Sequence, residues 1–245
     1  MGKRKKKEAI FLKLFWLNLL ALIAVVAVNA LANIVPFNGQ TTGEISDKLN
    51  VLFTPAGYVF SIWGLIYFLL AVWVLRGFNK GTTILYKDTH VPFLVSCLLN
   101  ITWIVLWHYE FFASSVAVII GLLLSLIVLY KRIERQRFEF WDRFPFSVYL
   151  GWVSVAVIAN ISYTLTHYNW TGFGISAFAW TILLIVVAAV LAISFRFSHH
   201  DRVYPLVFVW ALIGIAVRNW TGEPIVSYMA VAAAVIVLFS SFLKR

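Results

Sequence analysis

Eight long apolar stretches, separated by short polar connections, constrain this chain more than any other feature of its sequence. The hydrocarbon core of a bilayer is about 30 Å thick and requires roughly 20 helical residues to cross. The stretches are continuous and lack the alternating pattern of barrel strands, so helices are favoured over strands. The sequence therefore predicts an all-α integral membrane protein, a helical bundle of about eight transmembrane helices.

The predicted spans account for most of the chain. They are Phe11–Leu31, Gly57–Leu75, Val91–Tyr109, Phe111–Tyr130, Phe146–Leu165, Phe173–Phe195, Tyr204–Val217 and Ile225–Leu243. The seventh is the shortest, and if it enters and leaves on one side, the C-terminus moves across the membrane. With 62% hydrophobic and 12% charged residues, the composition excludes an ordinary soluble domain, in which about a quarter of residues are charged.

The distribution of positive charge orients the predicted bundle. If successive connections alternate sides, all 20 lysines and arginines except Lys48 and Arg218 lie on one side, from Lys3 to Lys244 and Arg245. Basic loops of membrane proteins stay in the cytoplasm, so we expect cytoplasmic N- and C-termini and a bacterial cell membrane. The net charge of +10 then reflects orientation and attraction to anionic lipids, and no nucleic acid is required.

The N-terminus permits two interpretations. Lys3–Lys7, the apolar run that follows and Val28–Ala30 together resemble a cleavable signal peptide. The run continues through Ile34, however, and is long enough to span a membrane. We therefore predict a retained first helix that follows a basic cytoplasmic N-terminus, residues 1–10.

Polar and aromatic side chains recur at helical spacing in three predicted spans. Residues three, four or seven positions apart share a helix face, and an asparagine that faced lipid would leave its amide unpaired in hydrocarbon. We therefore expect these faces to turn inward, either to pack and hydrogen-bond between helices or to line a cavity for a flat molecule. The three sets are Asn18, Asn29 and Asn33; Asn100, Trp103 and Trp107; and Trp152, Ala156, Asn160, Tyr163 and His167.

A tetrapeptide also repeats at the outer ends of two predicted helices. Asn169–Gly172 and Asn219–Gly222 both read NWTG. The repeat indicates either a trace of duplication or separate anchoring of tryptophans at the membrane surface.

The start of the second span resembles a known membrane family. Phe53–Tyr67, FTPAGYVFSIWGLIY, is similar to the Pro-Pro-Gly-Trp-Val-Phe…Trp-x-x-x-Tyr signature of the TspO/MBR family, the tryptophan-rich sensory proteins related to the translocator protein. Leu99–Trp103 resembles the family's Leu-Asn-x-x-Trp, and Trp152, Ala156 and Asn160 resemble its Trp…Ala…Asn. The likeness covers about residues 11–167, a TspO-like five-helix membrane core, and residues 168–245 would form an additional three-helix membrane extension.

One departure from the family pattern concerns spacing. Phe60 and Trp63 are three residues apart, where the family usually has four. In a regular α-helix this difference rotates Trp63 by about 100° unless the helix adjusts.

The resemblance implies a receptor- or sensor-like membrane protein that binds a porphyrin (a tetrapyrrole) or a similar flat lipophile in an aromatic intramembrane pocket. The porphyrin would be a ligand, with no required cofactor, and the resemblance also suggests a homodimer among membrane lipids. Gly57, which has no Cβ, would let a ligand or a neighbouring backbone approach. The implied ligand-binding residues are Pro55, Gly57, Tyr58, Phe60, Trp63, Tyr67, Asn100, Trp103, Trp152, Ala156 and Asn160.

Missing residue types narrow the remaining functions. The predicted spans contain no Asp or Glu, which disfavours proton-coupled transport and carboxylate-based hydrolysis, so we expect a binding protein and no enzyme. His108 and His167 are the only candidates for haem or metal ligation near helix ends, and we expect no metal site, because no further ligands accompany them. A permease for a neutral lipophilic solute and a membrane scaffold or assembly factor without a ligand stay open as alternatives.

Overall fold

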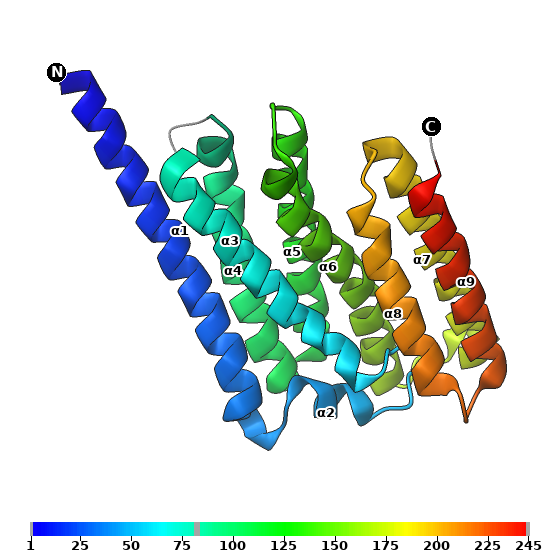
Figure 1. The fold of residues 1–245 in the computed structure, drawn as a ribbon. Helices are drawn as coiled ribbons and strands as arrows, with labels where there is room; N and C mark the ends of the chain where they lie inside the picture. The colour runs from blue at the N-terminus through cyan, green and yellow to red at the C-terminus, as the bar shows by residue number, and fades with distance from the viewer. Residues whose placement is uncertain (1, 81–83, 244–245) are drawn as a thin grey trace. The chain divides into compact units, whose positions relative to one another are not determined.

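The computed structural model describes residues 2–80 and 84–243, so Lys244 and Arg245 of the predicted cytoplasmic charge lie outside the described residues. Within those ranges the chain forms nine α-helices, three short 3-10 turns and no strand (Figure 1). Seven of these helices are long and apolar enough to cross a membrane. The prediction of an all-α membrane bundle is therefore confirmed.

The helices follow the predicted spans closely. They are α1 (Gly2–Ile34), α2 (Thr42–Asp47), α3 (Ile62–Lys80), α4 (Ile84–His108), α5 (Phe112–Glu134), α6 (Phe140–His167), α7 (Ala177–His199), α8 (Val203–Asn219) and α9 (Pro224–Phe242). The 3-10 turns are η1 (Phe37–Gly39), η2 (Gly57–Ser61) and η3 (Gly172–Gly174). The shortest predicted span corresponds to α8, whose 17 residues rise only about 26 Å at 1.5 Å per residue.

Local chemistry sets the helix boundaries that differ from the predictions. Phe173 was expected inside the sixth span, but it lies in η3 between two glycines with positive φ, Gly172 and Gly174, a conformation that interrupts a helix. The Ser176 side chain then accepts a hydrogen bond from the Ala179 N–H and caps the start of α7. The short helix α2 lies in the connection between the first two predicted spans.

The chain forms two compact units. Unit 1 comprises Met1–Thr42 and Trp63–Leu150, and unit 2 comprises Gly43–Ile62 and Gly151–Arg245. Residues 140–150 of α6 belong to unit 1 and residues 151–167 to unit 2. The bounds of these two units differ from those of the predicted five-helix core, residues 11–167, and the predicted extension, residues 168–245. The division into core and extension stays a prediction from the sequence.

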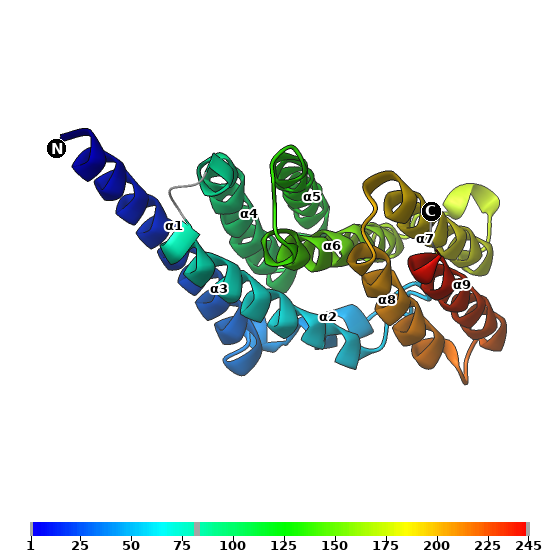
Figure 2. The same ribbon diagram turned by 45° about the horizontal axis from the view of Figure 1, so that its top comes forward.

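Unit 1 is built around α4, which contacts both α1 and α5; Figure 2 shows α4 and α5 side by side. Its aromatic core centres on Trp73, which is fully buried. The ring centroids of Tyr86, Phe93 and Phe146 lie 4.9, 5.1 and 5.0 Å from that of Trp73. Interlocking aromatic rings from α3, α4 and α6 therefore hold these helices together.

In unit 2 the helices α7, α8 and α9 each contact the other two, and α8 also contacts η2. The contact between α8 and η2 depends on Gly214. The Ala56 N–H donates to the Gly214 carbonyl at 3.1 Å. A Cβ on Gly214 would overlap the Val59 side chain and lie 3.1 Å from the Pro55 Cβ. Only glycine lets the segment before α3 pack this closely on α8.

This packing predicts an asymmetric response to two alanine substitutions. Gly214→Ala should lower the free energy of unfolding by about 1–3 kcal/mol, because the added methyl group overpacks a tight contact. Gly222→Ala is the matched control, since no atom lies within 4 Å of the position its Cβ would take. Reversible unfolding in detergent micelles measures both, and equal effects of the two substitutions would contradict the packing that we describe.

Candidate functional site

The residues implied by the resemblance are divided between the two units. Unit 1 holds Trp63, Tyr67, Asn100 and Trp103. Unit 2 holds the others, namely Pro55, Gly57, Tyr58, Phe60, Trp152, Ala156 and Asn160.

In unit 1 the predicted aromatic residues form one buried cluster, which we call the Trp63 cluster: Trp63, Tyr67, Trp103 and Tyr149. The Trp63 ring stacks on Tyr67 with centroids 5.8 Å apart, and it lies 5.6 Å from Trp103 and 6.0 Å from Tyr149. Trp63 and Trp103 are 9% and 5% exposed. The cluster gathers aromatic faces from α3, α4 and α6, and its indoles turn away from lipid as the sequence predicted.

A chain of amides runs beside this cluster. Asn29 Nδ2 donates to Asn100 Oδ1 at 2.9 Å, and Asn100 Nδ2 donates to the Tyr149 hydroxyl at 2.9 Å. Asn100 is completely buried. These bonds join α1, α4 and α6 and confirm the expectation that Asn29 and Asn100 face inward and hydrogen-bond between helices.

The Tyr67 hydroxyl differs from its neighbours. It is buried, yet it has no hydrogen-bond partner among the described residues. A buried polar group without a partner costs roughly 1–3 kcal/mol. The hydroxyl therefore adds a polar atom to the aromatic faces of the Trp63 cluster.

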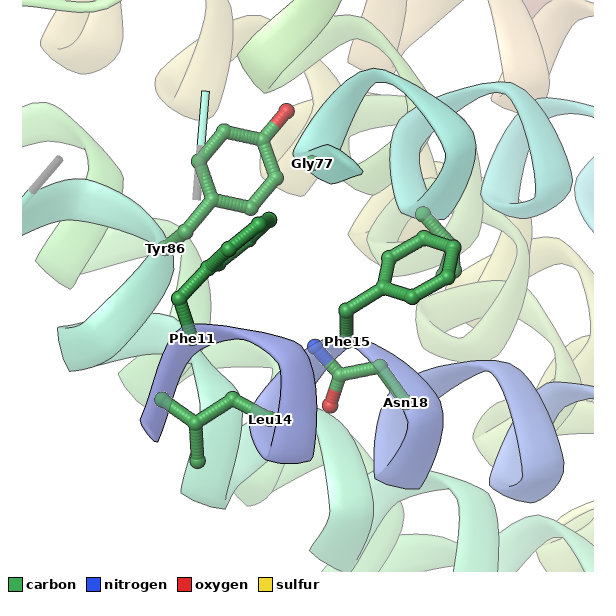
Figure 3. Close-up of a pocket in the computed structure, with 7 residues that line it drawn as sticks. Phe11, Leu14, Phe15, Asn18, Gly77 and Tyr86 are labelled. Carbon is green, nitrogen blue, oxygen red and sulfur yellow. The ribbon is translucent and has the colours of Figure 1, made fainter. Parts of the chain in front are cut away.

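The predicted inward face of α1 continues to Asn18. Its Oδ1 lies 2.7 Å from His90 Nδ1. Asn18 also lines a small cavity of about 10 Å³ beside Phe11, Phe15 and Tyr86 (Figure 3). A single water needs about 10–15 Å³, so this cavity is too small for an organic ligand.

Two residues predicted to face inward are exposed instead, Asn33 and His167. Both lie in the last turn of their helices, α1 and α6. Helical spacing gives the face of a residue but not its depth, and a polar group near a helix end can reach water without the cost of burial in hydrocarbon. Asn33 satisfies its own amide by donating to the Asn29 carbonyl.

The histidine considered as a metal ligand, His108, instead fastens a loop. It is completely buried, and its Nε2 lies 2.9 Å from Thr42 Oγ1. The Asn38 side chain donates to the His108 carbonyl. His108 therefore holds the connection that follows α1 against the end of α4.

In unit 2 the structure brings Phe60 and Trp152 together, with ring centroids 5.9 Å apart in an edge-to-face arrangement. Trp152 is 2% and Asn160 3% exposed, so both face inward as predicted. Asn160 Nδ2 donates to Thr164 Oγ1 at 3.5 Å. Ala156, between them on the same helix face, is partly buried.

The other unit 2 residues lie at or near η2. Residues 57–61 form a 3-10 turn, and Trp63 follows in the first turn of α3. Pro55 is buried against Gly214. Tyr58 is 46% exposed, and its ring meets the edge of Trp210 at 5.4 Å.

Gly57 does not make the close protein contact that the sequence suggested. It is exposed, and a Cβ there would meet no atom within 4 Å. The packing role expected for Gly57 is therefore wrong, and Gly214 fulfils it. The alternative, that Gly57 leaves room for a ligand, stays a prediction.

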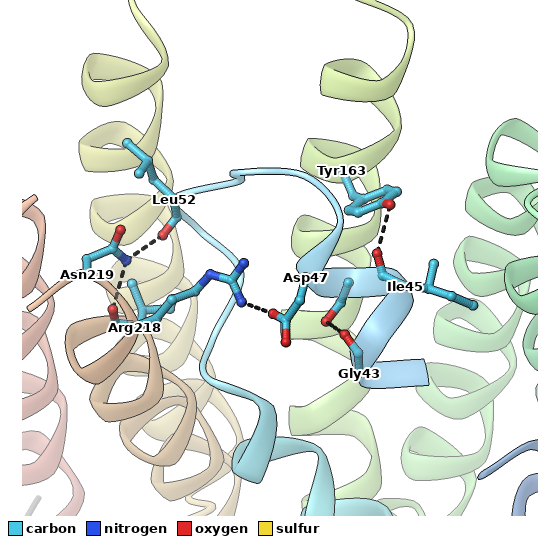
Figure 4. A network of polar contacts seen from close by, with 9 residues as sticks. Gly43, Ile45, Asp47, Leu52, Tyr163, Arg218 and Asn219 are labelled. Atoms are coloured by element: carbon cyan, nitrogen blue, oxygen red, sulfur yellow. Dashed lines mark hydrogen bonds and ion pairs between the residues drawn. The ribbon is translucent and has the colours of Figure 1, made fainter. Parts of the chain in front are cut away.

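The segment that precedes η2 is held by three side chains, and of these only Tyr163 was among the residues predicted to face inward (Figure 4). Asn219 donates to the Leu52 carbonyl at 2.9 Å and Tyr163 to the Ile45 carbonyl at 2.8 Å. Arg218 forms an ion pair with Asp47. One signal was available in the sequence, because Arg218 is one of only two basic residues outside the predicted cytoplasmic side.

Comparison with known proteins identifies a family. The family model described as TSPO-like protein matches residues 15–243. The match extends beyond the predicted five-helix core and includes the three C-terminal helices. Searches of curated proteins and of solved structures returned no match.

Proposed function

This chain belongs to the TSPO-like protein family, and on that premise we propose that it is a receptor- or sensor-like protein that binds a porphyrin or a similar flat lipophile. Its long apolar helices and its family make it an integral membrane protein of the TspO kind. The class of ligand is proposed in addition to what the family and the apolar helices establish. One observation carries it: the family's tryptophan, Trp63, lies in a buried cluster of aromatic rings.

The chemistry of the Trp63 cluster suits such a ligand. A conjugated macrocycle offers a broad flat face, and offset or edge-to-face contacts between aromatic rings contribute about 0.5–1.5 kcal/mol beyond the burial of their area. A few polar groups then orient a mostly apolar ligand. The Tyr67 hydroxyl, buried without a partner among the described residues, is one such group.

Titration of the purified protein with protoporphyrin IX, followed by quenching of tryptophan fluorescence, tests the proposal. We expect saturable quenching in the wild type. Trp63→Leu and Trp103→Leu should each weaken binding about three- to tenfold, the equivalent of one lost aromatic contact. Trp16→Leu is the control, since Trp16 is 54% exposed on α1 and lies outside the cluster. Absent saturation, or affinities unchanged by both cluster substitutions, would refute the proposal.

Tyr67→Phe separates a ligand-binding role from a structural one in the same titration. The substitution removes a buried hydroxyl that has no partner in the described structure, so the free energy of unfolding should stay constant or rise. The affinity for protoporphyrin IX should nevertheless fall. A loss of stability with unchanged affinity would show that the hydroxyl serves the fold.

We also propose that both termini face the cytoplasm of a bacterial cell. The support is the sequence-based charge distribution, which puts the α7–α8 connection inside and the α8–α9 connection outside. Two exposed positions, Ser198 and Thr221, lie at these connections. The natural cysteine, Cys97, is buried and should not react.

Labelling of single-cysteine variants with a membrane-impermeant maleimide tests this topology. Thr221→Cys should react in intact cells, whereas Ser198→Cys should react only after the membrane is permeabilised. Wild-type protein controls for Cys97. Labelling of Ser198→Cys in intact cells would reverse the proposed orientation.

A further inference from the structure

Unit 2 contains a cavity of about 540 Å³ that lies outside the predicted site. It is bounded by residues 50–53, by the second half of α6 and by the segment from Trp170 to Leu184. None of the residues implied by the family resemblance lines it. Pockets for small molecules typically measure about 300–1,000 Å³, so the cavity has the size of a ligand site.

The wall formed by the first NWTG tetrapeptide has a defined geometry. The rings of Trp170 and Trp180 lie 5.4 Å apart, and Trp180 Nε1 donates to the Gly172 carbonyl at 3.0 Å. Gly172 has a φ of +65°, and a Cβ on it would lie 3.1 Å from Trp180 Nε1. The left-handed backbone at Gly172 therefore permits the contact that fixes one indole in the wall.

The second NWTG tetrapeptide has a different role. Asn219 uses its amide to hold the Leu52 and Ile215 carbonyls, and a Cβ on Gly222 would meet no atom within 4 Å. The two tetrapeptides thus have the same sequence but make different contacts. The one at Trp170 builds a cavity wall, and the one at Trp220 anchors a loop.

That anchored loop forms another wall of the cavity. Leu52 lines the cavity and its carbonyl is held by Asn219. Earlier in the same segment, Asp47 pairs with Arg218, and the Ile45 carbonyl accepts from Tyr163 (Figure 4). Three polar contacts therefore fix the segment, so a ligand would not have to order it on binding.

The polar side chains that line the cavity carry no charge, and three of them are hydroxyls whose protons are already engaged. Ser162, Thr166 and Thr181 each donate their hydroxyl proton to a carbonyl of their own helix, at 2.8, 2.9 and 2.8 Å. Each hydroxyl oxygen keeps lone pairs that can accept a hydrogen bond. None of the lining residues, all of them in the described part of the chain, is charged.

This pattern distinguishes among possible ligands. A carboxylate or phosphate would find no cation among the lining residues, and the hydroxyls of Ser162, Thr166 and Thr181 would present oxygen lone pairs to it. A ligand hydroxyl, by contrast, can donate to the serine and threonine oxygens. The apolar walls and the two indoles suit a hydrocarbon body.

We propose that this cavity binds an uncharged lipid alcohol. Its hydroxyl donates to the oxygens of Ser162, Thr166 or Thr181, and its hydrocarbon chain packs against Trp170 and Trp180. The proposal does not depend on porphyrin binding, because it concerns different residues and a different ligand chemistry.

Three probes that share one brominated hydrocarbon chain and differ in their head group test the proposal. They are ω-bromo-undecanol, the corresponding carboxylate at alkaline pH, and bromoundecane. Bromine quenches nearby indoles, so quenching is followed in lipid nanodiscs of the full chain. The alcohol should quench saturably, and about three- to tenfold more tightly than the alkane or the carboxylate, the equivalent of about one hydrogen bond. Equal quenching by all three probes, or tighter binding of the carboxylate, would overturn it.

Variants locate the site. Trp170→Phe with Trp180→Phe should abolish the saturable component of quenching. Thr166→Val with Thr181→Val keeps the shape and removes two acceptors, so the preference for the alcohol over the alkane should disappear. Thr102→Val is the matched control, because Thr102 makes the same bond within α4, to the Leu98 carbonyl. A preference for the alcohol that survives in Thr166→Val with Thr181→Val, or falls equally in Thr102→Val, would refute the assignment.

Discussion

Polar groups inside a bilayer must find partners within the protein, and this requirement organises the structure. In unit 1 it is met by the chain from Asn29 through Asn100 to Tyr149. Because each amide is paired with another helix, α1, α4 and the start of α6 are fixed in register. The Trp63 cluster lies beside this chain, so the amides that stabilise the unit also position the aromatic faces on which the proposed porphyrin site depends.

Unit 2 meets the same requirement for an irregular segment. Backbone polar groups that are buried outside a regular helix need partners within the protein. In residues 43–56 the Ile45 and Leu52 carbonyls accept from Tyr163 and Asn219, and the Ala56 N–H donates to the Gly214 carbonyl. The segment consequently has one fixed position, and the cavity that it bounds exists before any ligand arrives.

The helices and their inward faces could be predicted from the sequence because both follow from local patterns. Apolar length gives a span, and helical spacing gives a face, as Asn29, Asn100, Trp103, Trp152 and Asn160 demonstrate. Depth along the helix was not encoded in that pattern, which is why Asn33 and His167 were misplaced. Gly214 and the cavity beside Trp180 were missed because their partners are far away in sequence and leave no local signal.

A double-mutant cycle at Asn29 and Asn100 tests the central claim most directly. The free energy of unfolding in lipid or detergent is measured for the wild type, Asn29→Ala, Asn100→Ala and the double variant. The account predicts a favourable coupling energy of about 0.6–1.7 kcal/mol, the range for hydrogen bonds between membrane helices. Strictly additive effects of the two substitutions would mean that the amides do not join α1 to α4, and would contradict the account.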